Sequence, residues 1–326
     1  MRYSYLAYGL LIQSELELPE LMPAPAGVAE LTIRRGKVAW QPTQPANPDG
    51  CIVEVEVNRI SFCWPQAGKF VAQNGREIIF DPITNAEDSL LRILILSAVM
   101  SAVLHQRGLL LLHASALCLG DEGVVFMGDK GEGKSTLAAS MQLNSFSMFE
   151  MVADDIVALT ISASESWILP AFPQFRLWPD AIASFGLDSE SLIVLHPELK
   201  KMAYRAEANF ASHPVRLRNV YVLDTGTPAS IELLNPKEAF LALARYSYLG
   251  RHIRATGLSS QHFKDCSHVA NSVPVARLRR PRSLELLADV GALVANDLAR
   301  GDGLPNTLIS HLNSVSRAET VKPGLS

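Results

Sequence analysis

One short segment, residues 128–135, constrains this chain more than any other feature. It reads Gly-Asp-Lys-Gly-Glu-Gly-Lys-Ser, which matches in full the Gly-x-x-x-x-Gly-Lys-Ser pattern of a phosphate-binding loop. An apolar, β-prone stretch, residues 123–127, precedes the segment, and residues 134–143 have helical composition. The order strand, loop, helix is the order that this pattern requires, so the sequence predicts an α/β nucleotide-binding unit.

The chemistry of such a loop lies in its backbone amides and in a few side chains. Glycines let successive N–H groups converge on phosphate oxygens, Lys134 is expected to reach the β- and γ-phosphates, and the Ser135 hydroxyl is expected to ligate Mg²⁺. We therefore predict ATP and Mg²⁺ as ligands. Two acids in the loop are expected to point outward while the backbone binds. The predicted nucleotide-binding residues are Gly128, Asp129, Lys130, Gly131, Glu132, Gly133, Lys134, Ser135 and Thr136.

The composition is that of a folded globular protein. The chain has 326 residues, 48% of them hydrophobic, which suffices for one large core or two smaller ones. The formal net charge of −4 gives no overall attraction to nucleic acid or to an anionic membrane, so we expect neither as a partner. The 4 cysteines are far apart in the sequence and include no Cys-x-x-Cys pair, which predicts buried, reduced thiols and no zinc site.

The most apolar run, residues 90–104, predicts a buried helix. Arg92 interrupts the run, which is shorter than the roughly 20 residues that a membrane span needs. Asp88 and Asn85 are available to cap the helix, and we expect it to end before Gly108. The N-terminus shows no cleavage signature of a secreted protein, so we expect a cytoplasmic protein.

Residues 1–84 are predicted to form a β-rich N-terminal domain. Residues 53–57 alternate with period two, and Asn74-Gly75 is a typical hairpin turn. A proline-rich stretch, residues 41–50, is expected to be an exposed loop, because proline lacks a hydrogen-bond donor and fixes φ. Two further short strands are expected at residues 60–64 and 77–80.

From residue 85 the pattern changes to alternating helices and strands. Residues 85–315 are predicted to form the nucleotide-binding domain, and residues 316–326 a flexible tail. In addition to the units already named, strands are expected at residues 109–119, 151–161 and 220–224, and helices at residues 236–248 and 283–299.

Residues 151–155 read Met-Val-Ala-Asp-Asp, an apolar stretch that ends in two adjacent acids. Phosphoryl transfer needs a carboxylate that helps to hold Mg²⁺ and a base that positions or deprotonates the attacking hydroxyl. Asp154 and Asp155 can divide these roles, and the sequence does not assign them individually. Without a preceding phosphate-binding loop, a solvated turn or a helix cap would be the ordinary interpretation of such a pair.

His113 lies in an apolar stretch within the strand expected at residues 109–119. A histidine in such a place must find a partner or remain neutral. Paired with a carboxylate it can relay the transferred proton, which makes it a candidate catalytic residue. The alternative is a core histidine with satisfied hydrogen bonds.

Together these motifs resemble the catalytic half of the HPr kinase/phosphorylase family. Leu112-His113 lies fifteen residues before Gly128, and the segment 152–155 follows the loop in the family's order. The resemblance covers roughly residues 105–160. It implies the α/β fold that this family shares with phosphoenolpyruvate carboxykinases, and transfer of a phosphoryl group to a serine hydroxyl of a protein. The residues that it implies as catalytic are His113, Asp154, Asp155 and Lys134, with Ser135, Asp154 and Asp155 at the metal.

The chain departs from that family at several places. Thr136 stands where the family usually has an acid, the interval from Ser135 to Asp154 is a few residues longer, and residues 170–180 replace the family's Arg-Gly-Leu-Gly segment. With its β-rich N-terminal part, the chain looks more like the divergent HPr kinase-like serine kinases, some of which accompany peptide-modification pathways. The resemblance implies a serine of a protein or peptide as the acceptor, and assembly into a homo-oligomer.

Arginines beyond the motifs are candidate substrate contacts. Arg176 can bind the γ-phosphate or an acidic acceptor through its rigid guanidinium, or form a surface ion pair with Asp180. Arg245 is a second candidate, followed by Arg251 and Arg254. The alternative for these three residues is a solvated helix face.

We predict an ATP-dependent kinase that transfers the γ-phosphoryl group to a hydroxyl. Two other functions are compatible with the same motifs. One is a non-catalytic regulatory module in which bound ATP orders a loop and recruits a partner. The other is a kinase of a small hydroxyl metabolite, which would differ only in its acceptor pocket.

Overall fold

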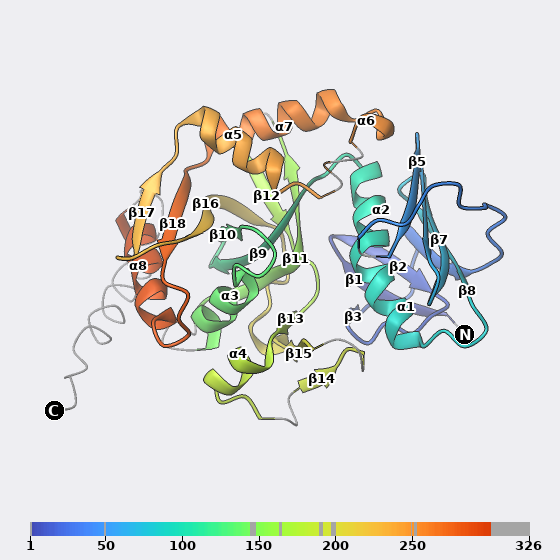
Figure 1. Ribbon diagram of the computed structural model, residues 1–326, viewed down its shortest axis with the longest axis horizontal. Helices are drawn as coiled ribbons and strands as arrows, with labels where there is room; N and C mark the ends of the chain where they lie inside the picture. The colour runs from blue at the N-terminus through green and yellow to red at the C-terminus, as the bar shows by residue number, and fades with distance from the viewer. Residues whose placement is uncertain are drawn as a thin grey trace.

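The structure is a computed structural model that describes residues 2–48, 50–143, 148–162, 165–188, 192–196, 200–248, 250 and 253–300. The architecture is mixed α/β with sheets of eight, seven and three strands (Figure 1). The tail predicted at residues 316–326 and the last part of the predicted 85–315 domain lie outside the described residues.

The first sheet contains all the strands before residue 83, in the order β3-β1-β2-β4-β8-β7-β6-β5. The strands expected at residues 53–57, 60–64 and 77–80 are confirmed within one or two residues. Asn74 and Gly75 have φ values of 55° and 61°, the left-handed turn that joins β7 to β8, as predicted. The strands are β1 (Tyr3–Ala7), β2 (Leu10–Ser14), β3 (Met22–Pro23), β4 (Leu31–Arg35), β5 (Ile52–Glu56), β6 (Arg59–Trp64), β7 (Gly68–Gln73) and β8 (Glu77–Pro82).

A long helix lies between the first and second sheets (Figure 1). It consists of α1 (Asp88–Leu94), a π-helical turn η1 (Ile95–Val99) and α2 (Met100–Gln106). Neither predicted cap is used, because the helix begins after an extended Glu87 whose side chain makes no capping bond. Among the described residues this is the one helix whose length and composition would suit a membrane span, yet 56% of its apolar window is buried, as expected of a core helix.

The second sheet has the order β10-β9-β11-β12-β16-β18-β17, and β10 also pairs with β16. The strands predicted around the glycine-rich loop and the helix predicted at residues 134–143 are confirmed. Strand β18 and helix α7 were not anticipated from the sequence. The elements are β9 (Leu110–Leu119), β10 (Glu122–Met127), β11 (Glu150–Ile161), β12 (Ser166–Leu169), β16 (Val215–Thr225), β17 (Ser230–Leu233), β18 (Val275–Arg280), α3 (Lys134–Leu143), α5 (Pro236–Arg245), α6 (Ile253–Thr256), α7 (Ser259–Ser272) and α8 (Leu287–Arg300).

Two hydrophobic clusters cover the two faces of the second sheet. In β10, Val125 and Met127 belong to one cluster, while Val124 and Phe126 belong to the other, because side chains alternate along a strand. The first cluster also contains residues of the first sheet, the long helix, α5 and α7. The second contains residues of α3 and α8 and of the three-stranded sheet β13 (Gln174–Leu177), β15 (Met202–Arg205) and β14 (Leu192–Val194), next to α4 (Pro179–Ser184).

Polar contacts also join the first sheet to the rest of the chain. The N–H of Tyr8, in the β1–β2 turn, donates to the Pro170 carbonyl at 2.7 Å. Arg92 of α1 pairs with Glu20 at 2.9 Å, and both side chains are largely buried. The β1–β2 turn is therefore held next to the segment that follows β12.

A buried histidine gives the fold a defined pH dependence. His105 of α2 lies 2.8 Å from the Thr256 hydroxyl, and burial lowers its pKa to about 4, with His262 adding to the effect. In the unfolded chain the pKa of a histidine lies near its ordinary value of about 6.5. Between these values the unfolded state binds more protons, so the free energy of unfolding falls as the pH falls.

We predict that His105→Gln weakens this pH dependence, because glutamine can keep the hydrogen bond to Thr256 but does not titrate. Between pH 6 and pH 5 the free energy of unfolding of the variant should fall by about 1 kcal/mol less than that of the wild type. Urea denaturation at each pH measures the effect. His213→Gln, at an exposed histidine, is the control and should follow the wild type. Equal slopes for all three proteins would contradict the assignment.

Candidate functional site

The glycine-rich loop, residues 128–133, joins the end of β10 to the first residue of α3. Gly131 and Gly133 have φ values of 91° and 77°, which disfavour any residue with a side chain. A Cβ on Gly133 would lie 2.8 Å from the guanidinium of Arg280. The loop thus needs glycine at these places, and it lies at the N-terminus of a ten-residue helix, where backbone N–H groups favour anions.

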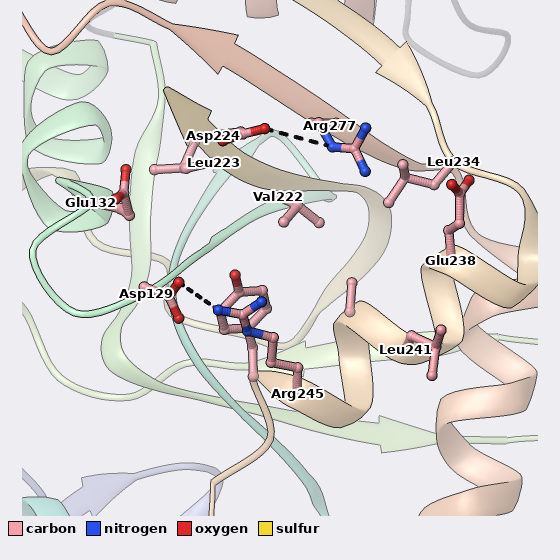
Figure 2. Close-up of a pocket in the computed structure, with 12 residues that line it drawn as sticks. Asp129, Glu132, Val222, Leu223, Asp224, Leu234, Glu238, Leu241, Arg245 and Arg277 are labelled. Carbon is pink, nitrogen blue, oxygen red and sulfur yellow. Dashed lines mark hydrogen bonds and ion pairs between the residues drawn. The ribbon is translucent and has the colours of Figure 1, made fainter. Parts of the chain in front are cut away.

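The two acids of the loop are each paired with an arginine that is distant in the sequence. Asp129 accepts a hydrogen bond from Arg245 of α5 at 2.7 Å, as Figure 2 shows. Glu132 forms an ion pair with Arg282, and its backbone carbonyl accepts a hydrogen bond from buried Arg280. The negative charge that the sequence places in the loop is therefore offset by cations that the folded chain brings to it.

Lys134 is buried with 7% of its surface exposed, and its ammonium donates to the carbonyls of Gly128 at 2.9 Å and Asp129 at 3.2 Å. Burial lowers the pKa of Lys134, and the nearby carboxylates Asp154 and Asp155 oppose this shift. The lysine ammonium, the loop and the two β11 acids therefore form one electrostatic group. Ser135 and Thr136 follow at the first turn of α3 and are half-buried.

Asp154 is held by hydrogen bonds to both carboxylate oxygens. Ser115, its neighbour on β9, donates to Oδ1 at 2.6 Å, and the backbone N–H of Arg176 donates to Oδ2 at 3.1 Å. The residue is 6% exposed. Its orientation is thus fixed by β9 and β13.

Asp155 faces three other side chains. Its Oδ1 lies 3.4 Å from His113 Nε2 and accepts the Tyr248 hydroxyl at 3.1 Å. Its Oδ2 lies 3.5 Å from an Arg176 guanidinium nitrogen. About a quarter of the side chain, 26%, remains exposed. Asp155 is the more accessible acid of the pair.

The backbone at Asp155 has a φ of 73°, which is rare for a residue other than glycine. In a regular strand two successive side chains point to opposite faces. Here both carboxylates contact Arg176. The backbone N–H of Arg176 donates to Asp154, and its guanidinium pairs with Asp155. The left-handed residue, which follows the register shift between Met151 and Ala153 of β11, brings both acids to one site.

His113 is predominantly neutral at neutral pH. Burial and the charge of Lys134 lower its pKa below the ordinary value of 6.5, although Asp155 and Asp154 oppose the shift. Its ring packs edge to face on Tyr248, with centroids 5.6 Å apart. The structure brings together His113, Lys134, Asp154 and Asp155, the four residues predicted to be catalytic.

Two tyrosines at the site were not anticipated. Tyr248 follows α5 and donates to Asp155, as described above. Tyr8 comes from the first sheet, is 2% exposed, and has a hydroxyl with no hydrogen-bond partner among the described residues. Burial and the nearby charge of Asp155 raise the pKa of both phenols. No local pattern in the sequence marks either tyrosine.

The predicted arginines have separate environments. Arg176 pairs with Asp155, while the carboxylate of Asp180, its suggested partner, accepts the N–H of Ala181 instead. Arg245 pairs with Asp129 at the loop. Arg254 is exposed, and Arg251 lies outside the described residues.

Two cavities adjoin the site and share Arg245 in their walls. The first, of about 430 Å³, lies between the glycine-rich loop, the ends of β16 and β18, and α5 (Figure 2). The second, of about 860 Å³, begins at His113 and Tyr248 and extends between the first sheet and helices α5, α6 and α7.

The residues predicted to hold Mg²⁺ offer oxygen ligands. Among the described residues there is no group of three or more His, Cys, Asp and Glu side chains that could hold a metal ion. Mg²⁺ commonly takes one or two carboxylates and completes its coordination with water and substrate phosphates. The carboxylate of Asp154, the hydroxyl of Ser135 and a bound triphosphate would match that preference.

Comparison with known proteins adds little to this geometry. No protein-family model matches the chain, and no curated protein matches it. Among solved structures, the chain is similar to the HPr(Ser) kinase/phosphatase from Coxiella burnetii, with a TM-score of 0.31 and 13% identity over 59% of this chain and 99% of that chain. At this TM-score and identity the similarity does not establish the family, so the family resemblance stays a prediction.

The left-handed backbone at Asp155 predicts an unusual order of stability. An alanine at a positive φ destabilises the folded state by about 1–2 kcal/mol, because its Cβ crowds the backbone, whereas a glycine has no Cβ and avoids this strain. We expect Asp155→Gly to be more stable than Asp155→Ala in urea denaturation. Asp154→Gly and Asp154→Ala are the matched controls and should show the opposite order. The same order at both positions would contradict the backbone geometry.

Proposed function

We propose that the protein transfers the γ-phosphoryl group of ATP to a hydroxyl, that of a serine in a protein or peptide. One observation carries the proposal: Asp155, paired with a predominantly neutral His113, lies at the same site as Lys134 and the glycine-rich loop. A base beside a phosphate-binding loop is the arrangement that phosphoryl transfer to a hydroxyl requires.

The order of strands suggests how ATP would lie. β10, which ends in the loop, has β9 and then β11 on one side, and β16 and then β18 on the other. The acids and His113 are on the β9–β11 side, whereas the 430 Å³ cavity is bordered by β16 and β18. We therefore place the γ-phosphate toward Asp155 and the nucleoside in this cavity, with the phosphates on the loop.

The two acids differ in exposure and in partners, and this difference supports separate roles for them in the proposal. Asp155 is the base, because it is partly exposed and faces His113 and Tyr248. Asp154, buried and held by Ser115, would hold Mg²⁺ together with Ser135. When bound, Mg²⁺ supplies positive charge that offsets the charge of the phosphates.

The transfer step forms one phosphorus–oxygen bond and breaks another. Asp155 accepts the proton of the serine hydroxyl while the serine oxygen forms the new bond to the γ-phosphorus. The bond from that phosphorus to the β,γ-bridging oxygen breaks, and ADP leaves with the electron pair. Lys134 and Arg176, two cations that interact with the acids, stabilise the negative charge on the transferring group.

The first test separates nucleotide binding from transfer. We expect Lys134→Ala to lose ATP binding, because the ammonium at the loop is removed. Asp155→Asn should bind ATP within about threefold of the wild type but transfer phosphate at least about 100-fold more slowly, since the base is lost. Calorimetry with ATP and label transfer from [γ-³²P]ATP to serine peptides measure the two effects.

Lys237→Ala, at an exposed lysine of α5, is the control for lost charge. Full transfer by Asp155→Asn would overturn the mechanism. ATP binding by the wild type with no label on any acceptor would favour a regulatory module instead, and label on small hydroxyl compounds alone would favour a metabolite kinase.

The pH profile provides a separate test. Because the pKa of His113 is lowered, the residue is already neutral in most molecules at pH 6.5 and above. With saturating ATP and Mg²⁺, we expect kcat/KM for the peptide to fall on the acid side with a midpoint below pH 6.5. A midpoint above pH 6.5 would indicate a raised histidine pKa and contradict the assignment.

A further inference from the structure

We propose that the 860 Å³ cavity is the acceptor-binding groove, and that it takes a peptide segment whose serine is flanked by a large apolar side chain and by an acidic one. This inference rests on the proposed function and adds the class of acceptor to it. It also gives the first sheet a role in selecting the substrate.

The position of the groove connects it to the reacting groups. Its inner end is formed by His113 and Tyr248, and both contact Asp155. Arg245 separates it from the cavity assigned to the nucleoside. A hydroxyl entering along this groove would reach the base from the side opposite to the nucleoside.

The walls of the groove are aromatic and come from both parts of the fold. Phe62 and Trp64 of β6 stack with ring centroids 5.5 Å apart, and Phe240 of α5 meets Phe263 of α7 edge to face at 5.2 Å. Phe263 is 59% exposed, although a phenyl ring is costly to leave in water. A concave surface with apolar walls and few polar groups is typical of a ligand site.

Among the residues that the structure describes, the charged side chains that line the groove are basic. They are Arg245 and Arg254, and no described aspartate or glutamate lines it. Of the two described arginines, Arg245 already pairs with Asp129, so Arg254, exposed on α6, is the one available to an incoming segment. This arrangement favours an acceptor with a carboxylate near the serine.

The size of the groove argues for a segment of several residues. Pockets for small ligands have volumes of roughly 300–1,000 Å³, and this groove lies near the upper end of that range. It extends from His113 to Phe263 at the surface, which leaves room for side chains next to the serine as well as the serine itself.

The test uses two groove variants with matched controls. Phe263→Asp removes the exposed aromatic wall, and Arg254→Glu reverses the charge. Val28→Asp, at an apolar residue that is 92% exposed, and Lys264→Glu, at an exposed lysine of α7, make the same kinds of change outside the groove. Thermal melting and ATP affinity confirm that each variant remains folded.

The probe is a fluorescein-labelled seven-residue peptide with a central serine, a phenylalanine on one side and an aspartate on the other, made in both orders. Peptides with Phe→Gly or Asp→Lys are the comparison. In the presence of AMPPNP, fluorescence anisotropy should show binding that each groove variant weakens at least tenfold and neither control changes. Arg254→Glu should prefer the lysine peptide to the aspartate peptide.

Steady-state transfer distinguishes this inference from the proposed function. We expect Phe263→Asp and Arg254→Glu to raise the KM for the peptide at least tenfold and to leave kcat within about threefold, because the groups that transfer the phosphoryl are untouched. Transfer that is indifferent to the flanking residues or to both variants would overturn the inference and leave the proposed function intact. Groove-dependent binding without transfer would support the groove and overturn the proposed function. A wild type that binds none of the peptides would overturn the inference.

Discussion

The candidate site depends on the pairing of Asp155 with His113, which in turn depends on the backbone at residue 155. Without the left-handed residue, strand alternation would direct two adjacent carboxylates to opposite faces of β11. With it, Asp155 lies 3.4 Å from His113, while Asp154 remains fixed by Ser115. Backbone strain of this kind persists where the surroundings fix it, here through Tyr248 and Arg176.

Electrostatics make the site suitable for a highly charged ligand. Asp129 and Glu132 would repel a triphosphate if they were unpaired, but Arg245 and Arg282 neutralise them at the rim of the loop. The buried Lys134 remains close to the β11 acids, where a phosphate group would replace the loop carbonyls as its partner. The proposed triphosphate site is therefore compatible with a net charge of −4 on the whole chain.

The sequence predicted the part of the site that local motifs encode. The loop, α3, β9 and β11 carry His113, Lys134, Asp154 and Asp155 in short segments of recognisable pattern, and the folded chain brings these residues together. The remaining partners arrive through long-range contacts. Tyr248 is 93 residues from Asp155, and Arg282 is 150 residues from Glu132. No periodicity or spacing relates residues so far apart, and the position of Tyr8 depends on how the first sheet packs.

The most direct test of the central claim is a crystal structure of the protein with Mg²⁺ and AMPPNP. We predict the triphosphate on the backbone amides of residues 128–135, with the γ-phosphate beside Asp155 and the nucleoside next to β16 and β18. A loop with no phosphate bound, or a γ-phosphate directed toward β16 and away from Asp155, would contradict it.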